Sequence, residues 1–194
     1  MFQYKEGNYK ESIDLLNVIA KQRPDFSSSY FYLTNCFLAI DDIINSKKNL
    51  AIYKSLEPTN ILPVKLAVSI AFKEKNYIEV IKNLNKIIEE EPENHTAYLR
   101  RGIAKSELKD YFGSTKDYEK AIELKPDYSM AYNNIAWNNF LQGNFEKALE
   151  YANKAIKFND INDTALDSRA DIKFALKDYN GCIEDSKASL AINP

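Results

Sequence analysis

Prolines recur along this sequence with a period of 34 residues. Five of them fall on this spacing: Pro24, Pro58, Pro92, Pro126 and Pro194. Asp160 takes the one place in the series where the proline is missing. A fixed period of this length is typical of proteins built from stacked structural repeats. It therefore predicts one repeat array, although a chain of 194 residues is long enough for one or two ordinary globular domains.

The repeat boundaries follow from the prolines. With the proline at position 32 of each unit, the first repeat is truncated and covers residues 1–26. The second to sixth repeats cover residues 27–60, 61–94, 95–128, 129–162 and 163–194. We therefore expect a single array over residues 1–194. Because the sequence begins inside a repeat, the possibility of a further segment upstream of Met1 stays open.

Each repeat carries the pattern of two amphipathic helices joined by a short turn. Apolar residues recur three and four positions apart, which gives each helix one buried stripe. The stretch from Ala97 to Pro126 shows the pattern, with its turn at Lys109–Tyr111. Position 15 is Gly7 in the first repeat and Gly143 in the fifth, where a left-handed helix end is least strained. Pro63 is expected early in a first helix, where its missing N–H costs little.

Several positions agree in register over five periods. Position 4 is mostly aromatic, position 17 is mostly Tyr or Phe, position 20 is mostly small, and position 8 is Gly102, Ala136 and Ala170 in the last three repeats. With the proline at position 32, this pattern resembles the tetratricopeptide repeat family over the whole chain. The fourth and fifth repeats match it closely, whereas the second and third carry Thr34 and Val68 at position 8. The resemblance implies an all-α fold, a right-handed superhelical solenoid of antiparallel helix hairpins.

The resemblance also implies a function, because members of the family are mostly scaffolds that bind peptides in a concave groove lined by first helices. In that geometry, positions 2, 5, 6 and 9 face the groove. The residues expected there to bind a peptide are Phe31, Tyr32, Asn35, Lys65, Leu99, Arg100, Ile103, Asn133, Asn134, Trp137, Asp167 and Asp171. Aromatic and Arg anchors beside amides suit peptide recognition. The alternative is that these residues pack on neighbouring first helices and bind nothing.

One subset of the family binds the C-terminal carboxylate of heat-shock chaperones through a clamp of Lys, Asn and Arg residues. Aligned from the second repeat, this chain has only Asn35 and Arg100 at matching positions. The other clamp positions hold Phe31, Leu66 and Thr96. When the clamp is aligned from the third repeat, the chain matches it at one position. The sequence therefore disfavours a role as a chaperone co-factor.

Two repeats share a charged sub-pattern that is absent from the others. Arg101 and Asp117 stand at positions 7 and 23 of the fourth repeat, and Arg169 and Asp185 take the same positions in the sixth. Lys also recurs at position 11 of these two repeats. Because a part-buried Arg needs a partner, we predict an Arg–Asp pair that ties the two helices of one repeat together. The alternative is a shared repeat subtype in which both side chains are solvated.

No residue pattern indicates a catalytic, cofactor or metal site, so we expect a non-enzymatic protein. His95 is the only histidine and opens a first helix. Cys36 and Cys182 show no CxxC or Cys/His spacing and lie too far apart in an array to form a disulfide. Asp163, with two further Asp at spacings of four, forms a straight helical stripe, which cannot surround a calcium ion. The expected role of that stripe is a solvated acidic face or the acidic end of the groove.

Charge and hydropathy restrict the remaining classes. A formal net charge of −2 and the absence of a continuous basic groove disfavour an RNA-binding helical repeat. No apolar run is long enough to span a membrane, and two unpaired thiols fit a reducing compartment, so we expect a cytoplasmic location. The expected partner is a protein or peptide. Two alternatives stay open: that these repeats are the interaction part of a larger enzyme or signalling protein, and that the uncapped ends self-associate.

Overall fold

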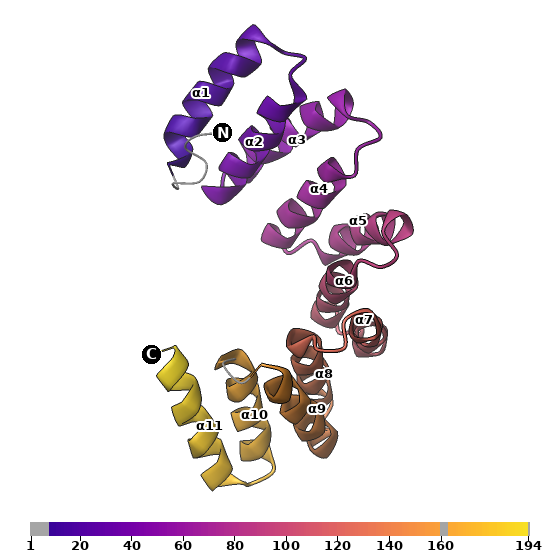
Figure 1. Cartoon of the computed structure of the whole chain (residues 1–194), viewed down its shortest axis with the longest axis vertical. Coiled ribbons are helices and arrows are strands. Elements are labelled where there is room, and N and C mark those ends of the chain that lie inside the picture. The colour runs from indigo at the N-terminus through magenta and orange to yellow at the C-terminus, as the bar shows by residue number, and fades with distance from the viewer. Residues whose placement is uncertain (1–7, 160–162, 194) are drawn as a thin grey trace. The chain divides into compact units, whose positions relative to one another are not determined.

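The protein is described by a computed structural model that covers residues 8–159 and 163–193 (Figure 1). Within those residues the chain forms eleven α-helices and no β-strand. The helices are α1 (Tyr9–Gln22), α2 (Ser27–Ala39), α3 (Ile43–Leu56), α4 (Leu62–Lys73), α5 (Tyr77–Glu90), α6 (His95–Glu107), α7 (Tyr111–Leu124), α8 (Ser129–Leu141), α9 (Phe145–Phe158), α10 (Asp163–Ala175) and α11 (Tyr179–Ile192). The predicted all-α fold of paired helices is confirmed, and Pro63 lies in the first turn of α4, as expected.

Every second helix begins at position 17 of its repeat, because the residue before it is suited to start a helix. Position 16 is Asp or Asn throughout: Asn8, Asp42, Asn76, Asp110, Asn144 and Asp178. In α3, α7 and α11 the Asp carboxylate accepts a hydrogen bond from the backbone N–H three residues later. That bond satisfies one of the donors left free at a helix start.

Position 15 adopts a left-handed conformation in every repeat for which it is described. Gly143 has a φ of 77°, and four residues with side chains have φ values between 55° and 65°: Asp41, Lys75, Lys109 and Lys177. The expectation for Gly143 is confirmed, whereas Gly7 lies outside the described residues. The turn therefore imposes the same backbone whether or not a glycine is available, and non-glycine residues adopt it at a conformational cost.

The chain divides into two compact units, Met1–Glu90 and Glu91–Pro194. The first unit contains α1 to α5 and the second contains α6 to α11. Each unit has its own hydrophobic core. The arrangement of all six predicted repeats as one continuous array therefore stays a prediction.

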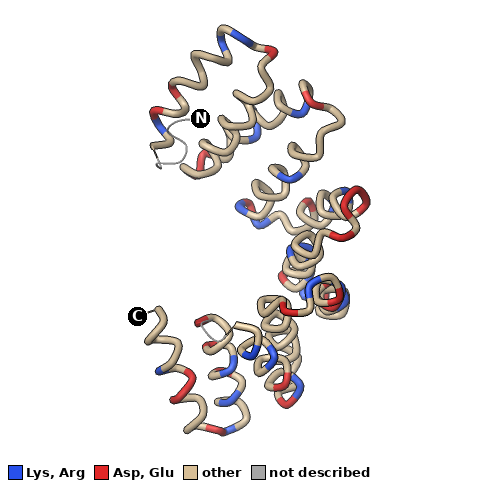
Figure 2. The backbone as a smooth tube through the Cα atoms, viewed as in Figure 1, with Lys and Arg blue, Asp and Glu red and all other residues tan. Residues whose placement is uncertain are grey.

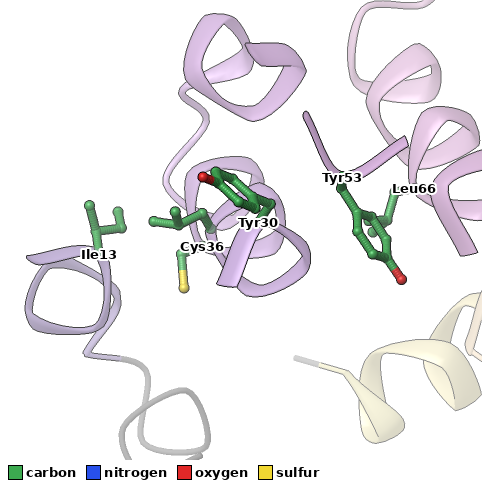
Figure 3. Close-up of a cluster of buried hydrophobic side chains, with 6 residues drawn as sticks. Ile13, Tyr30, Cys36, Tyr53 and Leu66 are labelled. Atoms are coloured by element: carbon green, nitrogen blue, oxygen red, sulfur yellow. The ribbon is translucent and has the colours of Figure 1, made fainter. Parts of the chain in front are cut away.

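The core of the first unit is built from four helices (Figure 3). Ile13 comes from α1, Tyr30 and Cys36 from α2, Tyr53 from α3 and Leu66 from α4, and each is at most 9% exposed. Each fully buried apolar side chain contributes roughly 1.5–3 kcal/mol. Since no single hairpin supplies all these residues, the repeats of this unit stabilise one another.

The second unit has two apolar clusters that overlap at α8. Leu99, Tyr118 and Ile135 belong to the first cluster, which joins α6, α7 and α8. Ala148 and Ile172 belong to the second, which joins α8, α9 and α10. Tyr151 packs against both clusters. Because α8 contributes residues to both clusters, it holds the neighbouring first helices α6 and α10 in position.

The two helices of the fourth repeat also meet at a glycine. A Cβ atom added to Gly102 of α6 would lie 2.5 Å from Cε1 of Tyr118 on α7. Tyr118 is 1% exposed and packs in the core of this unit, so moving its ring would disturb that packing. The glycine at position 8 and the tyrosine at position 24 are therefore a matched pair.

The predicted Arg–Asp pairs are confirmed in both repeats. Arg101 donates from Nε and Nη2 to the two carboxylate oxygens of Asp117, at 2.9 and 2.6 Å. Arg169 donates in the same way to Asp185, at 2.7 and 2.6 Å. Figure 2 marks the basic positions of α10 and the acidic segment of α11 in blue and red.

A lysine completes each pair. Lys105 Nζ lies 2.7 Å from Asp117, and Lys173 Nζ lies 2.9 Å from Asp185. Both aspartates are only 4% exposed. Each buried carboxylate is thus held by two cations from the other helix, an arrangement that orients the hairpin as well as neutralising the charge.

Candidate functional site

Three of the predicted groove residues of the second unit meet at a small hollow between α6, α7 and α8. Ile103 of α6 and Asn134 and Trp137 of α8 line it together with Tyr118 of α7, and its volume is about 90 Å³. Three of the expected peptide-binding residues are therefore brought together on one face. A hollow of this size accepts the tip of a small side chain.

The floor of the hollow is a polar network that sequence reasoning did not identify. Ser106 donates to Asn138 Oδ1 at 2.7 Å, and Asn138 Nδ2 donates to Ser114 Oγ at 3.0 Å. Asn138 is 1% exposed and Ser114 is fully buried. A buried network with its donors and acceptors paired gives α6, α7 and α8 a single relative arrangement. The neighbouring Tyr118 has its pKa raised to about 12, mainly by burial.

Two amide atoms on α8 are buried and lack a partner. Among the described residues, neither Oδ1 of Asn133 nor Nδ2 of Asn134 has a hydrogen-bond partner. Asn133 is 7% exposed, so little of its amide reaches water. An unsatisfied buried donor or acceptor costs about 1–3 kcal/mol. The two atoms are one acceptor and one donor on consecutive residues.

Trp137 gives this face a rigid aromatic surface. Its ring stacks on Phe140, with the centroids 5.0 Å apart and the planes inclined by 23°. The side chain is half-buried, so part of the indole stays accessible. Ile103, also half-buried, packs against the cluster around Leu99 and Tyr118. Both side chains are fixed by packing, which lowers the entropy that a ligand contact would cost.

Leu99 lies in the core and not at this hollow, and its role in the groove stays a prediction. Its side chain is 3% exposed and packs in the core with Tyr118 and Ile135. Arg100, the next residue, is half-buried, and burial lowers its pKa. The apolar stripe of α6 is therefore wide enough to include position 5, which the family geometry had placed in the groove.

Asp167 and Asp171 are exposed on α10 in the same unit. Neither carboxylate forms an ion pair within the described part of the chain. Their predicted role at the acidic end of a groove stays a prediction.

The remaining predicted residues lie in the first unit. Phe31 packs against the core and makes edge-on contacts with Tyr32 and Tyr53, at centroid distances of 5.2 and 5.6 Å. Asn35 donates from Nδ2 to the carbonyl of Phe31 at 2.8 Å. Lys65 is half-buried on α4. Phe31 and Asn35 thus have structural contacts of their own, within α2 and with α3, and their role in peptide binding stays a prediction.

The histidine and the buried cysteine, which are the residue types most often used in catalysis or redox chemistry, pack against other parts of the protein. His95 packs against the ring of Tyr128 at a centroid distance of 5.1 Å. Cys36 is fully buried, and burial raises the pKa of its thiol. Across residues 8–159 and 163–193, no three His, Cys, Asp or Glu side chains are grouped so as to hold a metal ion. Over the same ranges, no helix has the length and hydropathy needed to cross a bilayer.

Comparison with known families identifies two of the repeats. The family described as tetratricopeptide repeat matches residues 95–128 and residues 129–162. These are the hairpins α6/α7 and α8/α9, which also build the hollow.

Curated proteins match parts of the chain. Protein STIP1 homolog of Dictyostelium discoideum is 32% identical over 105 residues, which are 54% of this chain and 19% of that protein. Hsp70-Hsp90 organizing protein of Triticum aestivum is 31% identical over 96 residues, which are 50% of this chain and 16% of that protein. The matched part of this chain thus spans less than a fifth of the length of either relative.

Solved structures match most of the chain in fold. A tetratricopeptide repeat protein from Parabacteroides merdae has a TM-score of 0.85 at 17% identity, with 99% of this chain and 76% of that chain covered. PilW, a type IV pilus biogenesis factor, has a TM-score of 0.83 at 14% identity, with 98% and 88% covered. At such identities the likeness concerns the fold alone.

Proposed function

Since the chain belongs to the tetratricopeptide repeat family, we propose that it is a non-enzymatic scaffold that binds an extended segment of a partner protein. The binding face is the hollow of the second unit and the α8 residues beside it. The observation that carries this proposal is the convergence of Ile103, Asn134 and Trp137 at one hollow. The adjacent side-chain amides of Asn133 and Asn134 each carry a donor and an acceptor, which suits pairing with a peptide backbone of any sequence.

The surrounding residues favour a particular kind of segment. Trp137 and Ile103 provide apolar contacts for a side chain that enters the hollow. Arg100 favours an acidic side chain on the ligand, because charge-assisted hydrogen bonds are the stronger ones. Asp167 and Asp171 repel acidic residues and so set the direction of the peptide. The affinity is about micromolar, because ordering a flexible peptide offsets much of the contact energy.

The partner segment need not end in a free carboxylate. Relatives include a protein named for organizing Hsp70 and Hsp90, but the carboxylate clamp is incomplete in this chain. Leu66 and Thr96 stand where the clamp needs Asn and Lys, and Asn35 already donates to a backbone carbonyl. We therefore propose an internal segment as the ligand, which separates this scaffold from a chaperone clamp.

The proposal also holds if these repeats are one part of a larger protein. Because the matched part of the chain covers less than a fifth of the two relatives described above, we propose that it can act as the interaction part of a larger enzyme or signalling protein. Peptide binding by the second unit is expected in either context. An RNA-binding repeat is disfavoured by the net charge of −2, and a salt-dependent nucleic-acid titration separates that case.

Binding to a partner peptide tests the proposal directly. A partner is captured by pull-down, and its binding segment is titrated while the fluorescence of Trp137, the only tryptophan, is recorded. The combined variant Arg100→Glu, Asn134→Ala and Trp137→Ala, measured by calorimetry, is expected to lose binding. Asn180→Ala, on the exposed surface of α11, is the control.

Three outcomes would overturn parts of the assignment. Binding that the triple variant leaves untouched would move the site to another face of the repeats. Binding that amidation of the peptide C-terminus abolishes would restore the chaperone-type clamp. Turnover that survives purification and is lost on mutating a residue of this chain would contradict the non-enzymatic assignment.

A further inference from the structure

A second hollow lies in the first unit, between α3, α4 and α5, and has a volume of about 210 Å³. Its lining comes mainly from second-helix residues, including Lys47, Lys54 and Lys86, and from Ala67 of α4. None of these is among the residues predicted to line the peptide groove. This hollow is therefore independent of the proposed peptide-binding face.

The hollow exists because one side chain is small. Position 7 of the first helix is Ala67 in the third repeat, and the corresponding residues of the other repeats are Leu33, Arg101, Ile135 and Arg169. Leu33 and Ile135 are each 1% exposed, so this side chain normally fills the space between helices. Among the described first helices, only that of the third repeat has alanine at this position, where it lines the hollow.

The residues around the opening are basic where another repeat is apolar. Lys47 and Lys54 stand at positions 21 and 28 of the second repeat. The fifth repeat has Leu149 and Ile156 at these positions, and Leu149 packs against the cluster shared with α10. Where the fifth repeat has an apolar packing surface, the second repeat thus has two lysines at the rim of the hollow. The floor below this rim is apolar and includes Leu50.

Two of the three lysines are not engaged by acidic side chains. Lys47 pairs with Glu74 at 2.5 Å. Lys54 and Lys86 form no ion pair within the described part of the chain. Lys54 comes from α3 and Lys86 from α5, and both line the hollow. Together they offer positive charge from two helices to one bound group.

The hollow also has an acidic wall, which limits the ligand to one negative charge. Glu79 accepts from Asn83 Nδ2 at 3.1 Å and pairs with Lys82 at 3.3 Å. A ligand with a second anionic group would bring it near this carboxylate. An aliphatic chain, in contrast, suits the floor, because burying apolar surface there is favourable.

We propose that this hollow binds a single carboxylate carried on a short aliphatic chain, with the carboxylate between Lys54 and Lys86 and the chain over Ala67. Such a group comes either from a glutamate side chain of a partner protein or from a free short-chain carboxylate. A ligand this small is bound with a dissociation constant on the order of 1 mM. The volume of about 210 Å³ accommodates either source.

Backbone amide NMR titrations of the full chain test the proposal with defined probes. The probes are N-acetylglutamate N-methylamide, its glutamine counterpart, pentanoate and inorganic phosphate, all at constant ionic strength. Saturable shifts are expected in α3, α4 and α5 with the capped glutamate or with pentanoate, and none with the capped glutamine. Binding of the capped glutamate identifies a partner side chain as a source, whereas binding of pentanoate alone identifies a free carboxylate.

Matched variants separate the hollow from general surface charge. Ala67→Ile reproduces the residue of the fifth repeat, keeps all the lysines and is expected to abolish binding without lowering the melting temperature. Lys54→Gln with Lys86→Gln is expected to weaken binding by about fivefold or more, since each exposed ion pair contributes modestly. Lys10→Gln with Lys48→Gln removes the same charge from exposed positions outside the hollow and serves as the control.

Three results would overturn the proposal. These are the absence of saturable shifts, binding that survives Ala67→Ile, and an equal response to inorganic phosphate that the two lysine pairs reduce alike. The last two would show attraction to surface charge without a site. All of these outcomes are distinct from those for the peptide face, because they are read from α3 to α5.

Discussion

The fourth and sixth repeats fasten their two helices differently from the fifth repeat, which stands between them in the chain. In the fourth and sixth, Arg and Lys of the first helix hold a buried Asp of the second. In the fifth, the corresponding positions hold Ile135, Asn139 and Tyr151, and Asn139 donates instead to a carbonyl of its own helix. The helices begin and end at the same positions in all three repeats. The hairpin is therefore not dictated by the ionic cluster, which is one of two ways to fill the same interface.

The turns differ together with the interfaces. In the fourth repeat Lys109 takes the left-handed position, and Asp110 caps α7 at the backbone N–H of Gly113. A Cβ on Gly113 would lie 2.2 Å from the Asp110 carboxylate, so the carboxylate here occupies space that a side chain would need. In the fifth repeat Gly143 takes the left-handed position, and Asn144 forms no side-chain cap. The turn of the fourth repeat thus has a favourable helix cap and an unfavourable left-handed lysine. The turn of the fifth repeat has a favourable left-handed glycine and no side-chain cap.

The largest effect is expected from removing the carboxylate of the fourth repeat. Asp117→Ala leaves Arg101 and Lys105 facing each other at an interface where their side chains are only 18% and 22% exposed. The loss in the free energy of unfolding is expected to be about 3 kcal/mol. Urea denaturation measures it, and Asp127→Ala, at an exposed position, is the control.

A thermodynamic cycle sharpens this result. Arg101→Ala and Asp117→Ala together are expected to cost less than the sum of the two single changes, by about 0.5 kcal/mol or more. Strict additivity would mean that the two side chains act independently. The ionic repeats would then differ from the fifth repeat in composition but not in how their helices are held.

Gly102→Ala is expected to have the next largest effect, a loss of about 2 kcal/mol. The added methyl group would meet the ring of Tyr118 at 2.5 Å in a site that is 1% exposed. In the fifth repeat Ala136 faces the same side of the hairpin without such a conflict, because Ala152 stands at position 24. Combining Gly102→Ala with Tyr118→Ala should therefore cost less than the two single changes added together. Full additivity in urea denaturation would show that the two residues are not a matched pair.

The sequence alone predicted the helix pairs and the ionic pairs and missed features that depend on local packing. The period and the register placed every described helix, and the co-occurrence of Arg and Asp predicted the ionic pairs. Leu99 was assigned to the groove because the family geometry places position 5 there, whereas the local apolar stripe of α6 is wider. Asn138 was missed because an amide in an amphipathic pattern is expected on the surface, and only its partners Ser106 and Ser114 make its burial favourable.

The turn permits a reciprocal exchange with a smaller expected effect. Lys109→Gly relieves a non-glycine residue of its left-handed conformation, with φ at 64°, and should stabilise the protein by about 0.5–1 kcal/mol. Gly143→Lys should destabilise it by a similar amount, because φ is 77° there and a side chain would be strained. Changes of the same sign in the two variants, measured by urea denaturation, would show that the turns are not equivalent.

The smallest effect is a pH dependence that the sixth repeat has and the fifth lacks. Burial tends to raise the pKa of Asp185, but hydrogen bonds and charge from Arg169 and Lys173 outweigh it, so the pKa lies below its ordinary value of 3.8. A carboxylate with a lowered pKa in the folded state stabilises that state above the ordinary pKa, and this stabilisation is lost as the pH falls through the folded value. The urea midpoints of the wild type and of Asp185→Asn should therefore differ at pH 6 and converge below about pH 4, since Asn does not titrate. Asp171→Asn, at an exposed position of α10, is the control and should show little difference at either pH. The difference between the urea midpoints of the wild type and Asp185→Asn could instead stay constant or widen as the pH falls. In that case the carboxylate does not stabilise the sixth repeat through its charge, and the ionic and apolar hairpins respond alike to acid.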